Sequence, residues 1–328
     1  VVSSRRHVRV GGRRGRVAVK AQAEERFQWK GGGDGLGFKW EQPGRYVEAP
    51  AGSGLEHFHL DVGPKRSSLP PLLLLHGIPA YSYAWREVIP TLVNAGRRCV
   101  AVDLIGFGNS SKPQPGIGLF EYDIEAYVAS IDAVVDRLEL GIVEVVAPGY
   151  LGGVVGALWA GRNPDKCVKV TTLCAPLSHD LASAPPPPLK MLLNPLLAPL
   201  NAQNPLAIVG KPIEGAGPYA LDGNDQAAYQ QPMLQDGNGG FAMIQVCKAL
   251  KKSGAQLTAE AVKLLAQEGA PEWVVGVGEE DRWVTSAPPP SVADKHRVVK
   301  ITGVGQFASE DWSEKVAKLI IDNKYKGE

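Results

Sequence analysis

Leu-Leu-Leu-Leu-His-Gly-Ile-Pro, at residues 72–79, is a continuous apolar run that ends in a glycine-bearing loop. The same arrangement returns at residues 100–108, and a third apolar run follows at residues 143–146. Short runs of this kind are typical of buried strands. Between residues 123 and 138 the apolar positions recur at helical spacing, so strand, helix and strand predict a right-handed parallel crossover. We therefore expect an α/β fold with a mostly parallel central sheet flanked by helices.

This pattern is interrupted from residue 177 to residue 265. Leucine-rich segments broken by prolines replace it there, and strand patterns resume at residues 273–278 and 297–301. A strand-free insertion of this length between two sheet strands predicts a helical lid. We divide the chain into a basic segment at 1–25, a first core part at 26–176, the lid insertion at 177–265 and a second core part at 266–328.

Charge is distributed unevenly along the chain, although its formal net charge is only +1. Residues 1–23 contain seven lysines and arginines and no acidic residue. This composition is typical of an organelle transit peptide and predicts a chloroplast (plastid) location, with the mitochondrion as second choice. The alternative is a retained basic arm that joins a protein complex, which we expect more than nucleic-acid binding. No apolar run reaches the roughly 18 residues of a membrane span, so none is expected.

Histidines and cysteines do not show the spacing of a metal site. His57 and His59 alternate with apolar residues, so we expect them to line one face of an edge hairpin. The four cysteines show no Cys-x-x-Cys spacing and are expected to be buried free thiols; they are Cys99, Cys167, Cys174 and Cys247. We therefore predict neither a metal nor another cofactor.

Several motifs together carry a family resemblance that covers residues 38–325. They are His76-Gly77-Ile78-Pro79 with Tyr83 and Trp85, and the stretches Asp103–Ser110, Arg162–Lys166 and Gly278–Trp283. With these motifs the chain resembles the haloalkane-dehalogenase and epoxide-hydrolase-like branch of the α/β-hydrolase superfamily. It is most similar to a plant and algal plastid group, which shares Gly149-Tyr150 and, in the lid, Gly217-Pro218-Tyr219 with Tyr229. The resemblance implies an α/β-hydrolase fold with a helical lid.

The same resemblance implies a catalytic triad, but two of the three positions hold unsuitable residues. The nucleophile position falls on Tyr150 when counted back from Pro164, and on Gly149 when the plastid motif is aligned. Glycine has no side chain, and a phenol with a pKa of about 10 attacks only beside a strong base. Gln306 stands at the histidine position and cannot accept a proton, whereas Asp281 occupies the position of the orienting acid.

Other residues are candidates for ligand binding or for a replacement base. The resemblance places four of them in an oxyanion or ligand-binding region: Gly77, Ile78, Leu151 and Trp85. The expected hydrogen-bond donors there are the backbone N–H of Ile78 and that of the residue after the nucleophile position. His179, beside Asp180, is an alternative base, although the two neighbouring side chains are expected to point apart.

We therefore expect an α/β-hydrolase-fold protein with a degenerate triad and a non-hydrolytic role. That role is either binding of a small apolar ligand under the lid or service as a subunit or scaffold of a larger complex. The alternative is a hydrolase or lyase of this superfamily with an unconventional site, for example with His179 as base. Fold alone does not decide between them, but turnover of a simple ester would favour the enzyme.

Overall fold

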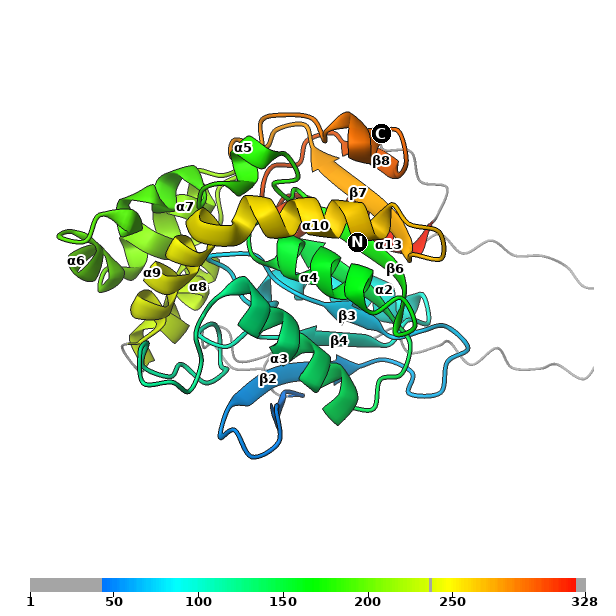
Figure 1. Ribbon diagram of the computed structural model, residues 1–328, viewed down its shortest axis with the longest axis horizontal. Coiled ribbons are helices and arrows are strands. Elements are labelled where there is room, and N and C mark those ends of the chain that lie inside the picture. Colours follow the sequence, from blue (N-terminus) through cyan, green and yellow to red (C-terminus); the bar gives the residue numbers. More distant parts are fainter. Residues whose placement is uncertain (1–42, 236–237, 323–328) are drawn as a thin grey trace, which may run out of the picture.

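The computed structural model of the chain describes residues 43–235 and 238–322. The basic segment at 1–25, with its predicted targeting or partner-binding role, lies outside the described residues. Figure 1 shows a central sheet covered by helices, with a group of short helices gathered at one end of it.

The central sheet has eight strands in the order β1-β2-β4-β3-β5-β6-β7-β8. β2 runs antiparallel to both β1 and β4, and all other neighbouring strands are parallel. The strands are β1 (Arg45–Glu48), β2 (Glu56–Val62), β3 (Leu72–Leu74), β4 (Cys99–Val102), β5 (Val143–Pro148), β6 (Cys167–Leu173), β7 (Glu272–Gly278) and β8 (Arg297–Ile301). The predicted α/β fold with a mostly parallel sheet is confirmed.

Helices cover both faces of this sheet. In Figure 1, α3 (Ile124–Arg137), α4 (Gly152–Arg162) and α10 (Ala255–Leu265) lie on the near face, and α4 packs between the other two. On the far face, α2 (Val88–Asn94) packs against α13 (Ser313–Ile321). The helix predicted between residues 123 and 138 is α3, which begins where the Asp123 carboxylate accepts a hydrogen bond from the Ala126 N–H at 2.7 Å.

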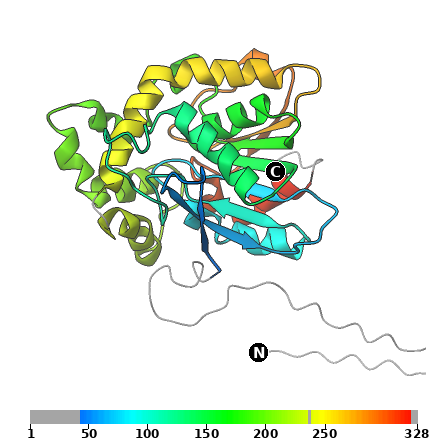
Figure 2. The same cartoon turned by 60° about the horizontal axis from the view of Figure 1, so that its bottom comes forward.

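The inserted lid is helical, as its proline-punctuated sequence predicts. It leaves the core after β6 and lies at one end of the sheet, which Figure 2 shows from a second direction. Proline stands in the first turn of several of its helices, where the missing N–H costs no hydrogen bond. Its elements are α5 (His179–Ala182), η2 (Pro187–Leu193), α6 (Ala198–Ala202), η3 (Leu206–Gly210), α7 (Lys211–Glu214), α8 (Gly223–Gln235), α9 (Gly239–Ala249) and η4 (Leu250–Gly254).

One detail differs from the sequence expectations. α10, inside the range that we assigned to the lid, packs along α4 and so belongs to the layer that covers the core. Its buried residues, including Leu257 and Leu265, form the apolar stripe that such packing needs. The remaining short helices are η1 (Ser82–Trp85), α11 (Pro290–Ala293) and α12 (Ala308–Asp311).

The structure also bears on the cysteines, on His57 and on whether a helix could span a membrane. All four cysteines are buried and free, as predicted. His57 lies in the edge hairpin β1–β2, where its Nε2 is 2.6 Å from the Ser130 hydroxyl of α3. Among the described residues, no helix combines the length and the apolarity that crossing a membrane requires.

Candidate functional site

The turn between β5 and α4, which we call the elbow (Gly149–Leu151), sets the geometry of the candidate site. Gly149 and Leu151 both have a φ of +61°, a left-handed conformation that costs a side-chain-bearing residue energy. A Cβ built on Gly149 would lie 2.9 Å from Nε2 of Gln306. Of the two alignments of the nucleophile position, Gly149 is therefore the one that faces the residue at the histidine position.

The loop that follows β3 packs tightly against the elbow. A Cβ on Gly77 would come within 2.9 Å of the Pro148 carbonyl oxygen, and one on Gly152 within 2.3 Å of the His76 carbonyl oxygen. The Ile78 N–H donates a hydrogen bond of 3.2 Å to the Tyr150 carbonyl. This N–H, which we expected to be an oxyanion donor, thus already has an acceptor in the protein, because the two loops approach so closely.

Gln306 is buried on the loop that follows β8. Its Nε2 donates to the Cys174 carbonyl at 2.9 Å, and its backbone N–H donates to Ala216 of the lid at 3.3 Å. The lid segment between α7 and α8 lies so close that a Cβ on Gly305 would be 2.5 Å from Cα of Gly217. Gln306 therefore faces the elbow beneath the lid, and its Oε1 has no hydrogen-bond partner among the described residues.

Asp281 follows β7 and is also buried. Its Oδ1 accepts hydrogen bonds from the N–H groups of Trp283 and Val284 at 2.8 and 3.0 Å, so the carboxylate caps this turn. Burial raises the pKa of Asp281 to about 6, against the lowering effect of these two bonds. Its Oδ2 has no hydrogen-bond partner among the described residues. Arg282 points elsewhere, with its guanidinium 3.5 Å from the Gly215 carbonyl.

Cys174 connects these two side chains. It follows β6 with a φ of +51°, and its buried thiol lies 3.2 Å from the Gly305 carbonyl and against the Asp281 carboxyl. Burial raises the pKa of this thiol well above its usual range, so Cys174 stays protonated and is a poor nucleophile. Gly149, Cys174, Asp281 and Gln306 thus gather at the carboxyl ends of four adjacent parallel strands, where ligand sites of α/β sheets lie.

Tyr150 supplies an aromatic surface and no nucleophile. Its ring is buried and meets Trp283 edge to face, with 6.4 Å between ring centroids, and Trp283 meets Phe307 in the same way at 5.4 Å. Burial raises the pKa of the Tyr150 phenol, with a smaller contribution from the Asp281 carboxylate. The phenol therefore keeps its proton at neutral pH.

Three candidate residues remain, and they differ in how deeply they are buried. Trp85 is fully buried and donates its indole N–H to the Leu75 carbonyl at 2.7 Å, which anchors η1 to the sheet. Leu151 is buried at the start of α4. His179, the alternative base, lies on α5 with 82% of its side chain exposed, whereas Gln306 and Asp281 are buried. Its Nδ1 is 3.5 Å from the Asp180 carboxylate, so these side chains do not point apart as expected.

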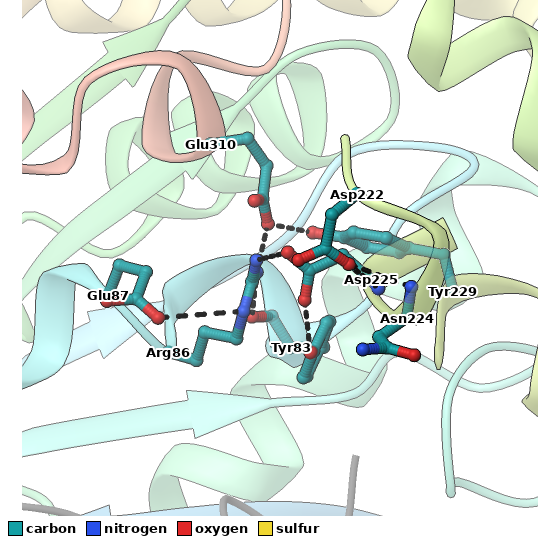
Figure 3. Close-up of polar contacts among 8 residues, drawn as sticks. All are labelled: Tyr83, Arg86, Glu87, Asp222, Asn224, Asp225, Tyr229 and Glu310. Atoms are coloured by element: carbon teal, nitrogen blue, oxygen red, sulfur yellow. Dashed lines mark hydrogen bonds and ion pairs between the residues drawn. The ribbon is translucent and has the colours of Figure 1, made fainter. Parts of the chain in front are cut away.

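Sequence reasoning missed a buried charged cluster between the lid and the core, which we call the Arg86 cluster (Tyr83, Arg86, Asp225, Tyr229 and Glu310). Figure 3 shows Arg86 between the carboxylates of Asp225, 2.7 Å away, and Glu310. The Tyr229 hydroxyl donates to Glu310, and the Tyr83 hydroxyl donates to Asp225 at 2.7 Å. The cluster joins η1, the lid helix α8 and α12, and no local sequence pattern connects residues so far apart in the chain.

Comparison with known proteins agrees with this geometry. The α/β-hydrolase fold family matches residues 70–199. A haloalkane dehalogenase from Psychrobacter cryohalolentis is 35% identical over 138 residues, which are 41% of this chain and 44% of that protein. A second, from Agrobacterium fabrum, is 40% identical over 113 residues, or 34% of each chain. The matched part of the chain thus spans less than half the length of these curated relatives.

Solved structures are similar over a larger part of the chain. A haloalkane dehalogenase from Bradyrhizobium elkani has a TM-score of 0.69 at 20% identity, over 85% of this chain and 96% of that one. Another, from Agrobacterium tumefaciens C58, has a TM-score of 0.67 at 24% identity, over 85% and 96%. Together with the strand order and the elbow, these similarities show that the chain has an α/β-hydrolase fold.

Proposed function

We propose that this chain binds a small apolar molecule beneath its lid and forms no covalent intermediate with it. One observation carries the proposal: Gly149 stands at the nucleophile position, and a Cβ there would point at the side-chain amide of Gln306. Covalent hydrolysis needs an attacking atom and a group that takes its proton, and this pair offers neither. The edge-to-face rings of Tyr150, Trp283 and Phe307 form an apolar cluster next to the elbow, against which we propose that the ligand packs.

A second candidate is a hydrolase that activates water directly at an unconventional site. Asp281 Oδ2 and Gln306 Oε1 are both buried, and neither has a nitrogen or oxygen donor within the part of the chain that the structure describes. Both side chains contact Cys174. A water held by these acceptors would give a proton to the Asp281 carboxylate, which is ionised above its pKa of about 6, and attack the substrate. The similarity to proteins named haloalkane dehalogenases supports this enzyme candidate over a purely binding one. His179 is a less suitable base because it is exposed.

A brominated alkane tests both candidates in one experiment. Bound beside Trp283, 1-bromohexane should quench tryptophan fluorescence in a saturable way, and a Trp283→Phe variant should lose that component. Under the binding proposal, bromide release stays at the level of buffer. Quenching that is the same in both proteins would contradict ligand binding at this surface.

Bromide release by the purified chain would instead favour the enzyme candidate. Asp281→Asn should then abolish release, because the amide cannot accept the proton of water, while His179→Ala should leave it unchanged. Release that survives Asp281→Asn but is lost in His179→Ala would point to the exposed histidine. A short acyl ester is tested in parallel, and the same assignments apply to its hydrolysis.

Plastid location and membership of a protein complex belong to this proposal as well. Both depend on the basic residues 1–23, whose charge would attract an acidic receptor or partner. N-terminal sequencing of protein isolated from the organism separates the two. A first residue between Ala21 and Glu24 supports targeting, whereas a first residue at or before Val1 supports a retained arm and favours a subunit or scaffold role.

A further inference from the structure

The outer end of the lid exposes a group of leucines, which we call the leucine tip (Leu196, Leu197, Leu200 and Leu206). Leu196 is 83% exposed and Leu200 is 69% exposed. These residues lie on and around α6, which Figure 1 shows at the end of the lid farthest from the sheet. Single exposed leucines are ordinary, but four within eleven residues of one protruding segment form a surface that water solvates poorly.

The charges around the tip point to the nature of its partner. Residues 191–210 contain no charged side chain, and Lys190 and Lys211, both exposed, stand at the two ends of this stretch. The longer segment 181–213 contains no aspartate or glutamate. An apolar tip flanked by cations and free of acids is complementary to the acyl boundary and the anionic headgroups of a lipid surface.

A protein partner fits these residues less well. Protein interfaces concentrate their binding energy in tryptophan, tyrosine and arginine, which usually fill pockets, whereas leucine is under-represented among such residues. Residues 191–210 contain no aromatic residue and no arginine. The tip is also a protruding end of the molecule, a shape that inserts into a lipid surface more readily than it receives a protein side chain.

We propose that the leucine tip docks the lid on an anionic lipid surface, with Leu196, Leu197 and Leu200 inserted at the boundary of headgroups and acyl chains. Lys190 and Lys211 would then lie at the level of the headgroups. This is attachment to one face of a bilayer and involves no membrane span. The inference is independent of whether the elbow binds or converts a ligand.

Vesicle flotation of the full chain tests the proposal. Vesicles are made of phosphatidylcholine alone or of phosphatidylcholine with phosphatidylglycerol. The wild-type chain should float with both and more strongly with the anionic mixture. A Leu196→Asp/Leu200→Asp variant should lose about tenfold or more of its partitioning onto both, because two leucines no longer leave water.

Two further variants separate the contributions. Ile142→Asp is the matched control: Ile142 is 51% exposed and precedes β5, at the end of the sheet opposite the lid, so it should float like the wild type. Lys190→Glu/Lys211→Glu should weaken flotation with the anionic vesicles by about tenfold while leaving flotation with neutral vesicles unchanged. All variants are checked for an unchanged melting temperature, which is expected since the substituted side chains are exposed.

Three results would overturn the proposal. The first is a wild-type chain that does not float with either vesicle. The second is a Leu196→Asp/Leu200→Asp variant that floats like the wild type, which would assign lipid binding to the basic residues 1–23. The third is concentration-dependent dimerisation that this variant abolishes without any lipid binding, which would make the tip a contact between two copies of the chain.

Discussion

At the scale of single residues, Gly149 shows how one position without a side chain fixes a packing arrangement at the elbow. Any side chain at position 149 would crowd Gln306. Nε2 of Gln306 lies 2.9 Å from the place where the Cβ would be. Glycine at the elbow and glutamine on the last loop are therefore compatible, and Gln306 makes Gly149 harder to replace alone.

This coupling predicts the stability of a Gly149→Ala variant. The positive φ alone should cost about 1–2 kcal/mol, and the contact with Gln306 should add to it. Gly141→Ala is the matched control, since Gly141 has a φ of +66° and open space around its Cβ position. Urea unfolding should show a larger loss for Gly149→Ala than for Gly141→Ala, and Gln306→Ala should reduce the excess. Equal losses would mean that Gln306 does not fill the space at the elbow.

At the scale of elements, the lid is held to the core by buried charge as well as by apolar packing. Arg86, with 11% of its side chain exposed, contacts Asp225 of α8 and Glu310 of α12. Burial raises the pKa of Glu310, and Arg86 opposes that rise because the guanidinium favours the carboxylate. The hydroxyl of Tyr81, which immediately precedes η1, donates a hydrogen bond of 2.9 Å to the Ala228 carbonyl of α8. This part of the core therefore contacts the lid through several side chains.

Removing the central cation should therefore destabilise the closed lid. In Arg86→Leu the buried Glu310 and the partly buried Asp225 lose their cationic partner and keep only a tyrosine hydroxyl each, and the free energy of unfolding should fall by about 3–5 kcal/mol. Arg162→Leu is the control, because Arg162 bridges Glu125 and Glu260 at a more exposed place and should cost about 0–1 kcal/mol. Urea unfolding gives both values. Replacing Glu310 by glutamine in the Arg86→Leu background should recover part of the loss, and no recovery would speak against unpaired charge as the cause.

At the scale of the whole molecule, buried titratable groups make stability depend on pH in two opposing ways. Burial raises the pKa of Asp103, Asp281 and Asp311 to about 6, so the folded state binds protons that the unfolded state releases. Their contributions to stability fall as pH rises from about 4 to about 6. Burial lowers the pKa of His57 and His76 to about 4, so their contributions rise with pH between about 4 and 6.5.

The contribution of Asp281 can be isolated by an Asp281→Asn variant, which keeps the Oδ1 acceptor of the turn. The wild type should lose stability relative to the variant by about 2 kcal/mol between pH 4.5 and pH 7, since only the wild type must ionise a buried carboxyl. Chemical unfolding at a series of pH values measures this difference. A difference that is the same at all pH values would show that Asp281 has an ordinary pKa in the folded protein.

The sequence by itself determined the class of the fold and which residue types stand at the positions that the resemblance assigns to a triad. The apolar runs of β3, β4 and β5 and the periodicity of α3 depend on residues close together in the chain, so local patterns predict them. The absence of a histidine at position 306 is a fact of sequence and needs no structure.

Only the tertiary structure decided which residue faces Gln306, whether the Ile78 N–H is already bonded and what holds the lid. The choice between Gly149 and Tyr150 depends on the path of the elbow, and the engagement of the Ile78 N–H depends on how closely two loops pack. The exposure of His179 and the assembly of the Arg86 cluster depend on contacts between segments far apart in the chain. Such contacts form because burial of apolar surface brings these segments together, and that process leaves no local signal in the sequence.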